Sequence, residues 1–253
     1  MIVGLPPPVG PGYLQAVDLG TVLGVWAHPD DEAYLSSGLM AQAAAAGSRV
    51  VCVTATRGEG GSTDLDRWPP ETLAEVRTGE LQRCLSMLGV QEHTFLDLPD
   101  VDWHTPLSDE GAAEVAAVMA EVAPDTVLTF GPDGMTNHEG HKSVSHWATD
   151  AFRRHAPIGA RLYYAVQSTA WGEEFLPSLQ ELGAFRDGAD APVLADDEID
   201  LDLVLTGDLL DLKVAAIREH ESQVAGLIAA FGEADWSRAM ARESFRLAET
   251  KSA

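Results

Sequence analysis

Short apolar, often β-branched runs alternate with helix-like segments along most of the chain, and this alternation constrains the fold more than any other feature. The runs predicted to be strands are 21–27, 49–56, 93–98, 125–132 and 160–167. The segments predicted to be helices are 32–46, 71–89 and 110–123, with a further helix that opens at or just after the polar cluster following residue 132 and ends near residue 154. This order predicts an α/β fold, a Rossmann-like and mainly parallel sheet with helices on both faces.

The remaining segments are less regular. Residues 1–18 are rich in proline and glycine and are predicted to form a loosely ordered N-terminal arm. From residue 168 onward the sequence becomes acidic and is predicted to be rich in loops, and residues 209–231 are predicted to form one amphipathic helix. No internal repeat or linker divides the 253 residues, so we expect a single domain spanning 1–253.

The charge balance excludes two classes of partner. The chain has 40 acidic residues against 16 lysines and arginines, a formal net charge of −24. Nucleic acids and anionic membrane surfaces are bound by clustered cations, so we expect neither partner. The N-terminal sequence does not resemble a secretory signal, and no run reaches the roughly 18 apolar residues that a membrane span requires. We therefore expect a cytoplasmic protein; its oligomeric state cannot be predicted from the sequence.

Two polar clusters follow two of the predicted strands. AHPDDE (27–32) follows the first, and GPDGMTNHEGHKSVSHW (131–147) follows the strand predicted at 125–132. In open parallel sheets the active site lies beyond the carboxyl ends of the strands. His138 and His141 are three residues apart, which places both on one face of a helix. Histidines and carboxylates that meet in this way, with one position open, are typical of catalytic zinc.

A simpler interpretation of AHPDDE is a helix N-terminus stabilised by acids. Asp30, Asp31 and Glu32 would each interact favourably with the helix dipole. That interpretation accounts for one or two acids, but it explains neither the histidine nor the second cluster. Closely spaced carboxylates also repel each other when buried unless a cation lies among them.

Several motifs together resemble the LmbE/PIG-L family of zinc-dependent N-deacetylases. In order they are AHPDDE, TRGEGG (56–61), VRTGEL (76–81), GPDGMTNHEGH (131–141) and HESQ (220–223). That family includes the deacetylases of mycothiol and bacillithiol biosynthesis, mycothiol S-conjugate amidase and N-acetylglucosaminyl-phosphatidylinositol deacetylases. The resemblance implies removal of an N-acetyl group from an N-acetylglucosaminyl conjugate, a small-molecule amino-sugar substrate, by zinc-activated water.

The resemblance also implies roles for individual residues. His28, Asp31 and His141 correspond to the zinc ligands, and Asp30 corresponds to the general base. His138 corresponds to the group that stabilises the oxyanion or donates a proton to the leaving amine. The family commonly has HxDH where this chain has Gly140 before the last histidine. The acid role of His138 is therefore open, and Glu139 or Asp133 are candidates to replace the missing aspartate.

Three further residues are candidates for substrate binding, each with an alternative. Arg77 either contacts substrate or forms a helix-surface ion pair with Glu80. Glu59 lies in a glycine-rich loop that allows close approach of a ligand, or that simply turns. His220 either reaches the pocket rim or has a capping or surface role. Three tryptophans in predicted loops either line a sugar pocket or pack against the fold: Trp68, Trp103 and Trp171.

Three rival functions remain to be weighed. An amidase that cleaves a thiol conjugate or another amide would share every catalytic residue. A non-catalytic binding relative would keep the fold and lose turnover, and Gly140 is its only support. A dinucleotide-binding protein does not fit, because the first strand leads into HPDDE rather than GxGxxG, and three acids would repel phosphate.

Overall fold

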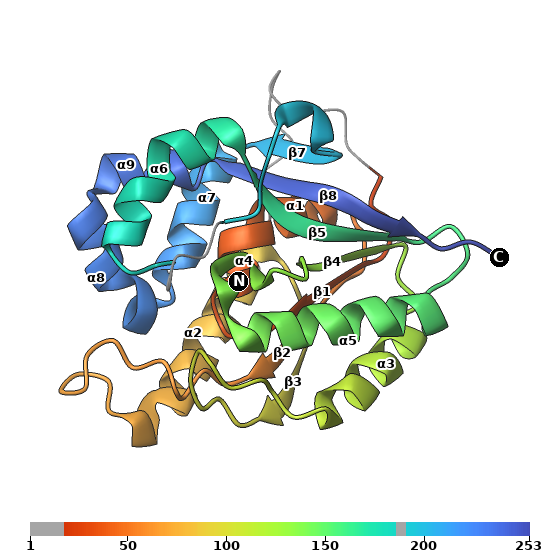
Figure 1. The fold of residues 1–253 in the computed structure, drawn as a ribbon, viewed down its shortest axis with the longest axis horizontal. Coiled ribbons are helices and arrows are strands. Elements are labelled where there is room, and N and C mark those ends of the chain that lie inside the picture. Colours follow the sequence, from red (N-terminus) through yellow and green to blue (C-terminus); the bar gives the residue numbers. More distant parts are fainter. Residues whose placement is uncertain (1–17, 186–190) are drawn as a thin grey trace, which may run out of the picture.

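A mixed sheet forms the centre of the protein, as the computed structural model shows for residues 18–185 and 191–253. Its order is β3-β2-β1-β4-β5-β8-β7, with β6 paired to the end of β5 (Figure 1). The strands are β1 (Val22–Trp26), β2 (Val50–Thr56), β3 (Glu92–Leu98), β4 (Thr126–Phe130), β5 (Arg161–Ser168), β6 (Val193–Leu194), β7 (Leu201–Val204) and β8 (Arg242–Thr250). The arm predicted for residues 1–18 lies outside the described residues except for Asp18.

Strands β1 to β5 run parallel to one another, while β8 runs antiparallel to both β5 and β7. The predicted α/β fold with a mainly parallel sheet is confirmed. From β1 the chain moves outward to β2 and β3, and then returns to add β4 and β5 on the other side of β1. The order therefore reverses between β1 and β4, and ligands of such sheets bind at this switch point.

Helices cover both faces of the sheet (Figure 1). Helices α1, α2 and α7 pack together, and α3 packs with α5. Right-handed crossovers place α1 and α2 on the face opposite α3 and α5. The helices are α1 (Asp31–Ala45), α2 (Pro70–Leu88), α3 (Glu110–Val122), α4 (Gly134–Asn137), α5 (Glu139–His155), α6 (Thr169–Glu181), α7 (Gly207–Arg218), α8 (Glu221–Phe231) and α9 (Glu233–Ala239). Among these helices, none combines the length and apolar character needed to cross a bilayer.

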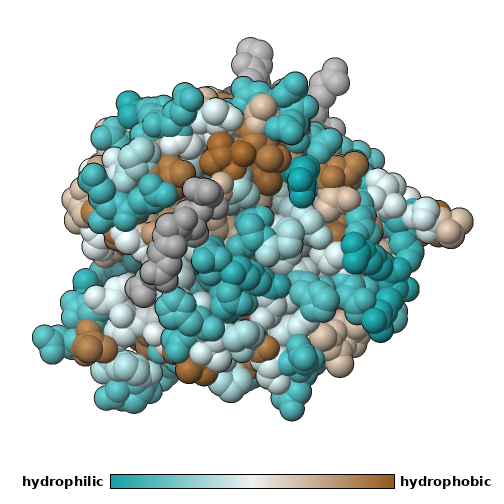
Figure 2. All heavy atoms as spheres, viewed as in Figure 1, coloured by the Kyte–Doolittle hydropathy of each residue, from teal (hydrophilic) through white to brown (hydrophobic). Residues whose placement is uncertain are grey.

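The central strands are buried along their whole length. All residues of β1, β2 and β4 are buried, because helices cover the sheet on both sides. At the ends of β1 and β4, the rings of Trp26 and Phe130 pack edge to face with centroids 5.1 Å apart. The outer surface is hydrophilic over most of the face in Figure 2, in keeping with the net charge of −24.

The region after β5 differs from its prediction. Residues 169–181 form α6 where loops were predicted, and β8 was not predicted at all. The single helix predicted for 209–231 is wrong: α7 and α8 are separate, and His220 between them has φ −85° and ψ 48°. The side chains of His220 and Ser222 make buried hydrogen bonds to α1 and α2, and these tertiary contacts override the helical periodicity.

A buried ion pair joins this later region to α1. Lys213 of α7 and Glu243 of β8 are fully buried, with Nζ 2.9 Å from Oε1. The Glu243 carboxylate accepts hydrogen bonds from the backbone N–H groups of Gly38 (2.8 Å) and Leu39 (2.9 Å). Lys213 also donates to the carbonyl of Tyr34 at 2.8 Å. Helix α1, which begins in the AHPDDE motif, is thereby fixed to β8 and α7.

Candidate metal centre and active site

The side chains of His28, Asp31 and His141 meet at the switch point between β1 and β4. His28 Nδ1 lies 3.2 Å from His141 Nε2, and Asp31 places its carboxylate oxygens 3.4 Å from His141 Nε2 and 3.7 Å from His28 Nδ1. Each residue is only 7% exposed. The structure thus brings together the three residues that the sequence predicts as metal ligands.

Backbone groups hold this cluster in place. The Oδ2 atom of Asp31 accepts hydrogen bonds from the N–H groups of Ala27 (3.1 Å) and His28 (2.8 Å), at the end of β1. The ring of His141 stacks on Phe130, the last residue of β4, with centroids 4.1 Å apart and an angle of 7°. The strand ends therefore determine the orientation of two of the three side chains.

On both His28 and His141, the ring nitrogen that faces away from the cluster lies near a hydrogen-bond acceptor. His141 Nδ1 lies 2.9 Å from the carbonyl oxygen of Gly134, so it donates and leaves a lone pair on Nε2. His28 Nε2 lies 3.5 Å from Asp100 Oδ1, which favours a proton on Nε2 and a lone pair on Nδ1. Two lone pairs and a carboxylate then face one another, an arrangement that repels itself unless a cation lies between them.

These atoms fit a divalent metal. Zinc binds nitrogen at about 2.0–2.1 Å, so tetrahedral coordination separates two ligand atoms by about 3.3 Å. The separations of 3.2 Å and 3.4 Å in the cluster agree with that value. Burial raises the pKa of Asp31 to about 7, against the opposing effect of His28, and burial lowers the pKa of His141 well below its usual value. Without a cation, burial therefore disfavours both the Asp31 carboxylate and the protonated ring of His141. A bound cation removes that penalty for the Asp31 carboxylate.

Asp30 lies beside the three ligands in an unusual backbone conformation. It precedes α1 with φ 124° and ψ −28°, a region that non-glycine residues rarely adopt. Its N–H donates to Glu32 Oε2 at 3.1 Å, and its carboxylate lies 3.2 Å from Arg77 Nη2. Burial raises the pKa of Asp30, and the Arg77 guanidinium opposes this shift. The carboxyl group lines the cavity described below.

His138 is the residue that caps α5, and its ring lies alongside that of His141, with centroids 4.7 Å apart and an angle of 14°. Its Nδ1 accepts a hydrogen bond from the backbone N–H of Gly140 at 3.0 Å. A Cβ atom at position 140 would lie 3.1 Å from this nitrogen, closer than most side chains tolerate. The backbone of Gly140 therefore holds His138 directly.

Neither acid that the sequence suggested as a replacement for the missing aspartate is oriented for that role. Glu139 pairs with Lys142 at 2.7 Å. Asp133 accepts a hydrogen bond from the N–H of Met135 at 2.7 Å. Among the described residues, the main chain contributes a contact to His138 through the N–H of Gly140, and sequence patterns do not reveal such a contact.

Arg77 is buried, with 3% exposure, and does not pair with Glu80. Glu80 accepts hydrogen bonds from Ser222, through N (2.8 Å) and Oγ (2.6 Å). The guanidinium of Arg77 instead donates to the carbonyls of Pro29 (2.6 Å) and Gly58 (2.9 Å). A Cβ atom on Gly58 would lie 2.3 Å from Arg77 Nη1, so this glycine admits Arg77 rather than a ligand. Arg77 also lines the cavity, so contact with substrate stays a proposal.

Glu59 and His220 are not among the residues that line the cavity, and their contact with substrate stays a prediction. Glu59 Oε1 accepts a hydrogen bond from the N–H of Asp100 at 3.1 Å. His220 is fully buried, with Nε2 3.1 Å from Glu32 Oε1. The hydrogen-bond partners of both residues are distant in the sequence. The motifs therefore predicted that Glu59 and His220 lie near the site, but not which groups they contact. Both support residues that surround the metal centre.

The sequence analysis missed Asp100. Its side chain is 6% exposed and lies beside His28 Nε2. A signal for it was present, because Asp100 follows β3 and so belongs to the same edge of the sheet as the two histidine clusters. A carboxylate that accepts from a metal-binding histidine orients the ring and increases its basicity.

A cavity of about 980 Å³ opens over these side chains. His28, Asp30, Asp31, His138 and His141 all line it. Trp68, Trp103 and Trp171, which were candidates for a sugar pocket, line it as well. The ring centroids of Trp103 and His138 are 4.6 Å apart, so an aromatic surface adjoins one of the candidate catalytic residues.

Comparison with known proteins identifies the family. The sequence pattern of PIG-L, described as GlcNAc-PI de-N-acetylase, matches residues 23–152, which include all three candidate ligands. The chain belongs to the PIG-L family. The predicted resemblance is thereby confirmed.

Two bacterial relatives support the assignment to the PIG-L family. The 1D-myo-inositol 2-acetamido-2-deoxy-α-D-glucopyranoside deacetylase of Kineococcus radiotolerans is 34% identical over 80% of this chain and 68% of its own. The enzyme of the same name from Saccharomonospora viridis is 32% identical over 80% of this chain and 85% of its own. Among solved structures, the N,N'-diacetylchitobiose deacetylase of Pyrococcus horikoshii has a TM-score of 0.63 at 22% identity, over 91% of this chain and 84% of its own, which shows a shared fold.

Proposed function

We propose that this protein is a zinc-dependent N-deacetylase that removes the acetyl group from an N-acetylglucosaminyl conjugate. The observation that carries the proposal is the set of three ligand atoms from His28, Asp31 and His141 that lie together, with Asp30 and His138 lining the same cavity. Membership of the PIG-L family and the names of its relatives support the same reaction.

An amide resists attack by neutral water, so the site must activate both reactants. Zinc held by the three ligands would lower the pKa of water and polarise the acyl oxygen. Asp30 accepts the proton that the attacking water loses, because its carboxylate lines the cavity beside the ligands. Arg77 holds that carboxylate at 3.2 Å and the preceding carbonyl of Pro29 at 2.6 Å.

His138 faces the other side of the reacting carbonyl. Because its Nδ1 accepts from the N–H of Gly140, the neutral ring carries its proton on Nε2. That N–H can donate to the oxygen as negative charge develops on it. The proton held by Asp30 then passes to the departing nitrogen as the carbon–nitrogen bond breaks, which leaves acetate and a primary amine. In this account His138 acts as a hydrogen-bond donor, and Gly140 is compatible with turnover.

The test is release of primary amine and acetate from a panel of N-acetylglucosaminyl conjugates, with metal analysis of the same protein. We expect equal amounts of the two products, loss of release with a chelator, and recovery on addition of zinc. No amine from any conjugate while zinc is bound would overturn the proposal. Release of an acid larger than acetate from thiol conjugates, without release of acetate, would favour an amidase instead.

A further inference from the structure

One part of the cavity differs chemically from the metal centre. We call it the apolar arm, and it is lined by Leu35, Leu179, Leu182, Leu227, Trp236 and Met240. These residues come from α1, α6, α8 and α9 and from the positions directly after α6 and α9. Elsewhere the lining of the cavity contains hydroxyl and carboxylate groups, among them those of Ser62, Thr63 and Asp102. The two parts of the cavity therefore suit different parts of a ligand.

The cations of the cavity are already engaged. Each of the three arginines that line it, within residues 18–185 and 191–253, pairs with a carboxylate: Arg67 with Glu221, Arg77 with Asp30 and Arg242 with Asp202. No lysine of these residues lines the cavity. To pair with any of these described cations, a phosphate or other anionic group on the ligand would have to displace an existing partner.

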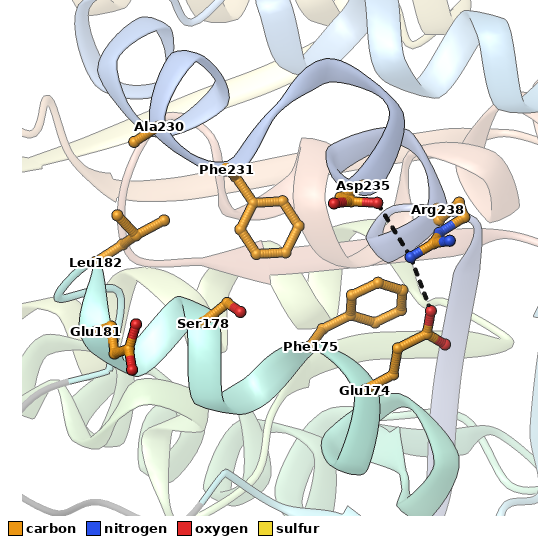
Figure 3. Close-up of a pocket in the computed structure, with 9 residues that line it drawn as sticks. All are labelled: Glu174, Phe175, Ser178, Glu181, Leu182, Ala230, Phe231, Asp235 and Arg238. Carbon is orange, nitrogen blue, oxygen red and sulfur yellow. Dashed lines mark ion pairs between the residues drawn. The ribbon is translucent and has the colours of Figure 1, made fainter.

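A second pocket, of about 240 Å³, adjoins the apolar arm (Figure 3). Leu182 and Ala230 line both spaces. Figure 3 shows the rings of Phe175, from α6, and Phe231, from α8, in this pocket. The same pocket is also lined by Glu174, Glu181, Asp235 and Arg238, so its surface is partly aromatic and partly charged.

We infer that the apolar arm binds the aglycone of the substrate, and that this aglycone is an uncharged alkyl or aryl group. This inference rests on the proposed deacetylase function. The acetyl group has only two carbons and needs no arm, and sugar hydroxyls find partners in the polar part of the cavity. A polyhydroxylated aglycone such as inositol would lose hydrogen bonds to water in the apolar arm without replacing them. The preferred substrate thus differs from the one named for the bacterial relatives.

The first test compares conjugates that differ only in the aglycone: methyl, octyl and inositol N-acetylglucosaminides, each below any micelle concentration. Each buried methylene contributes about a threefold to fourfold gain in binding, so we expect kcat/KM for the octyl conjugate to exceed that for methyl at least about tenfold. The gain should appear in KM, since the arm does not touch the reacting atoms. Equal or better turnover of the methyl or inositol conjugate would overturn the inference and leave the deacetylase function intact.

The acyl side of the substrate provides an internal check. Methyl N-octanoylglucosaminide carries the same alkyl chain on the amide instead of the aglycone. We expect it to be a poorer substrate than the octyl aglycone conjugate. If it shows the tenfold gain and the octyl aglycone does not, the arm binds acyl groups and the inference is wrong. Failure of every conjugate with zinc bound would instead refute the deacetylase function.

A matched pair of variants tests the arm itself. Leu227→Ser should reduce the octyl-to-methyl ratio of kcat/KM about fivefold to tenfold, through KM for the octyl conjugate. Ile158→Ser, at a residue that is 74% exposed and does not line the cavity, should leave the ratio unchanged. A general folding defect lowers both rates together, so an unchanged ratio in Leu227→Ser would contradict the inference.

Discussion

Two regions of the chain line the cavity above the candidate metal centre, and they contribute different kinds of side chain. Residues 22–155, from β1 to α5, carry the charged side chains of the metal centre. Residues 168–253 carry most of the apolar wall, through α6, α8 and α9. The PIG-L family match ends at residue 152, so it covers the first region but only Leu35 of the apolar arm. If the arm binds the aglycone as inferred, the reaction type and the choice of substrate depend mostly on different parts of the sequence.

The two regions are nevertheless coupled through buried polar contacts. His220, from the second region, reaches Glu32, which in turn accepts the N–H of Asp30 in the first. Lys213 and Glu243 fix α1 in the same way. These contacts hold the strained backbone of Asp30. The second region therefore supports the geometry of the first region, as well as lining the cavity.

The largest effect should follow from removing a ligand in the first region. His141→Ala should lose zinc and all detectable deacetylation, because it leaves one histidine and one carboxylate. His146→Ala is the matched control, since His146 lies on the same helix and is exposed. Metal analysis and amine release check both variants. Full zinc content in His141→Ala would contradict the assignment of the ligands.

Next in size is the loss of the general base. Asp30→Asn should lower kcat about 100-fold to 10,000-fold, because proton transfer by a positioned side chain contributes that much. Zinc should stay bound, since Asp30 is not one of the three ligands. Kinetics and metal content of the same preparation check this. Turnover close to that of the unmodified protein would mean that another group takes the proton.

The third prediction concerns the connection between the regions. Lys213→Met leaves the Glu243 carboxylate buried without its ion pair, and should cost about 3–5 kcal/mol in the free energy of unfolding. Arg49→Met breaks the exposed pair with Glu92 and should change the free energy of unfolding far less, because water screens that pair. Denaturant unfolding compares the two. Equal costs would show that the buried pair does not hold the regions together.

The smallest of these effects should come from the support of Asp30. His220→Leu removes the donor to Glu32 and should lower kcat about 10-fold to 100-fold, as the loss of a supporting contact commonly does. His220→Asn keeps an N–H donor and should lose less. Zinc content and KM should change little in both. If the two variants are equally impaired, His220 contributes packing and not a hydrogen bond.

The difference between the two regions also explains which strands and helices could be predicted from the sequence. Strands β1, β2 and β4 are buried on both faces, so each reads as an apolar run, and the chemistry follows directly after β1 and β4. Helix α6 contains Gly172 and Pro177, which weaken its helical signal. Strand β8 lies between β5 and β7 and is buried at only three of its nine residues, so it has no apolar run.

The candidate site could likewise be predicted only in part from the sequence. The candidate ligands and Asp30 follow strand ends, and motif spacing is enough to find them. The roles of Arg77, Glu59 and His220 depend on partners far away in the sequence, namely Pro29, Asp100 and Glu32. Spacing along the chain carries no information on such contacts, and none on the apolar arm.

One measurement tests the central claim most directly: stoichiometric addition of zinc to chelator-treated protein, with acetate release from an N-acetylglucosaminide followed at each step. The account predicts no activity without metal, and a linear rise that ends at one zinc per chain. Full activity without metal would contradict the account. So would one bound zinc per chain with no release of acetate from any conjugate of the panel.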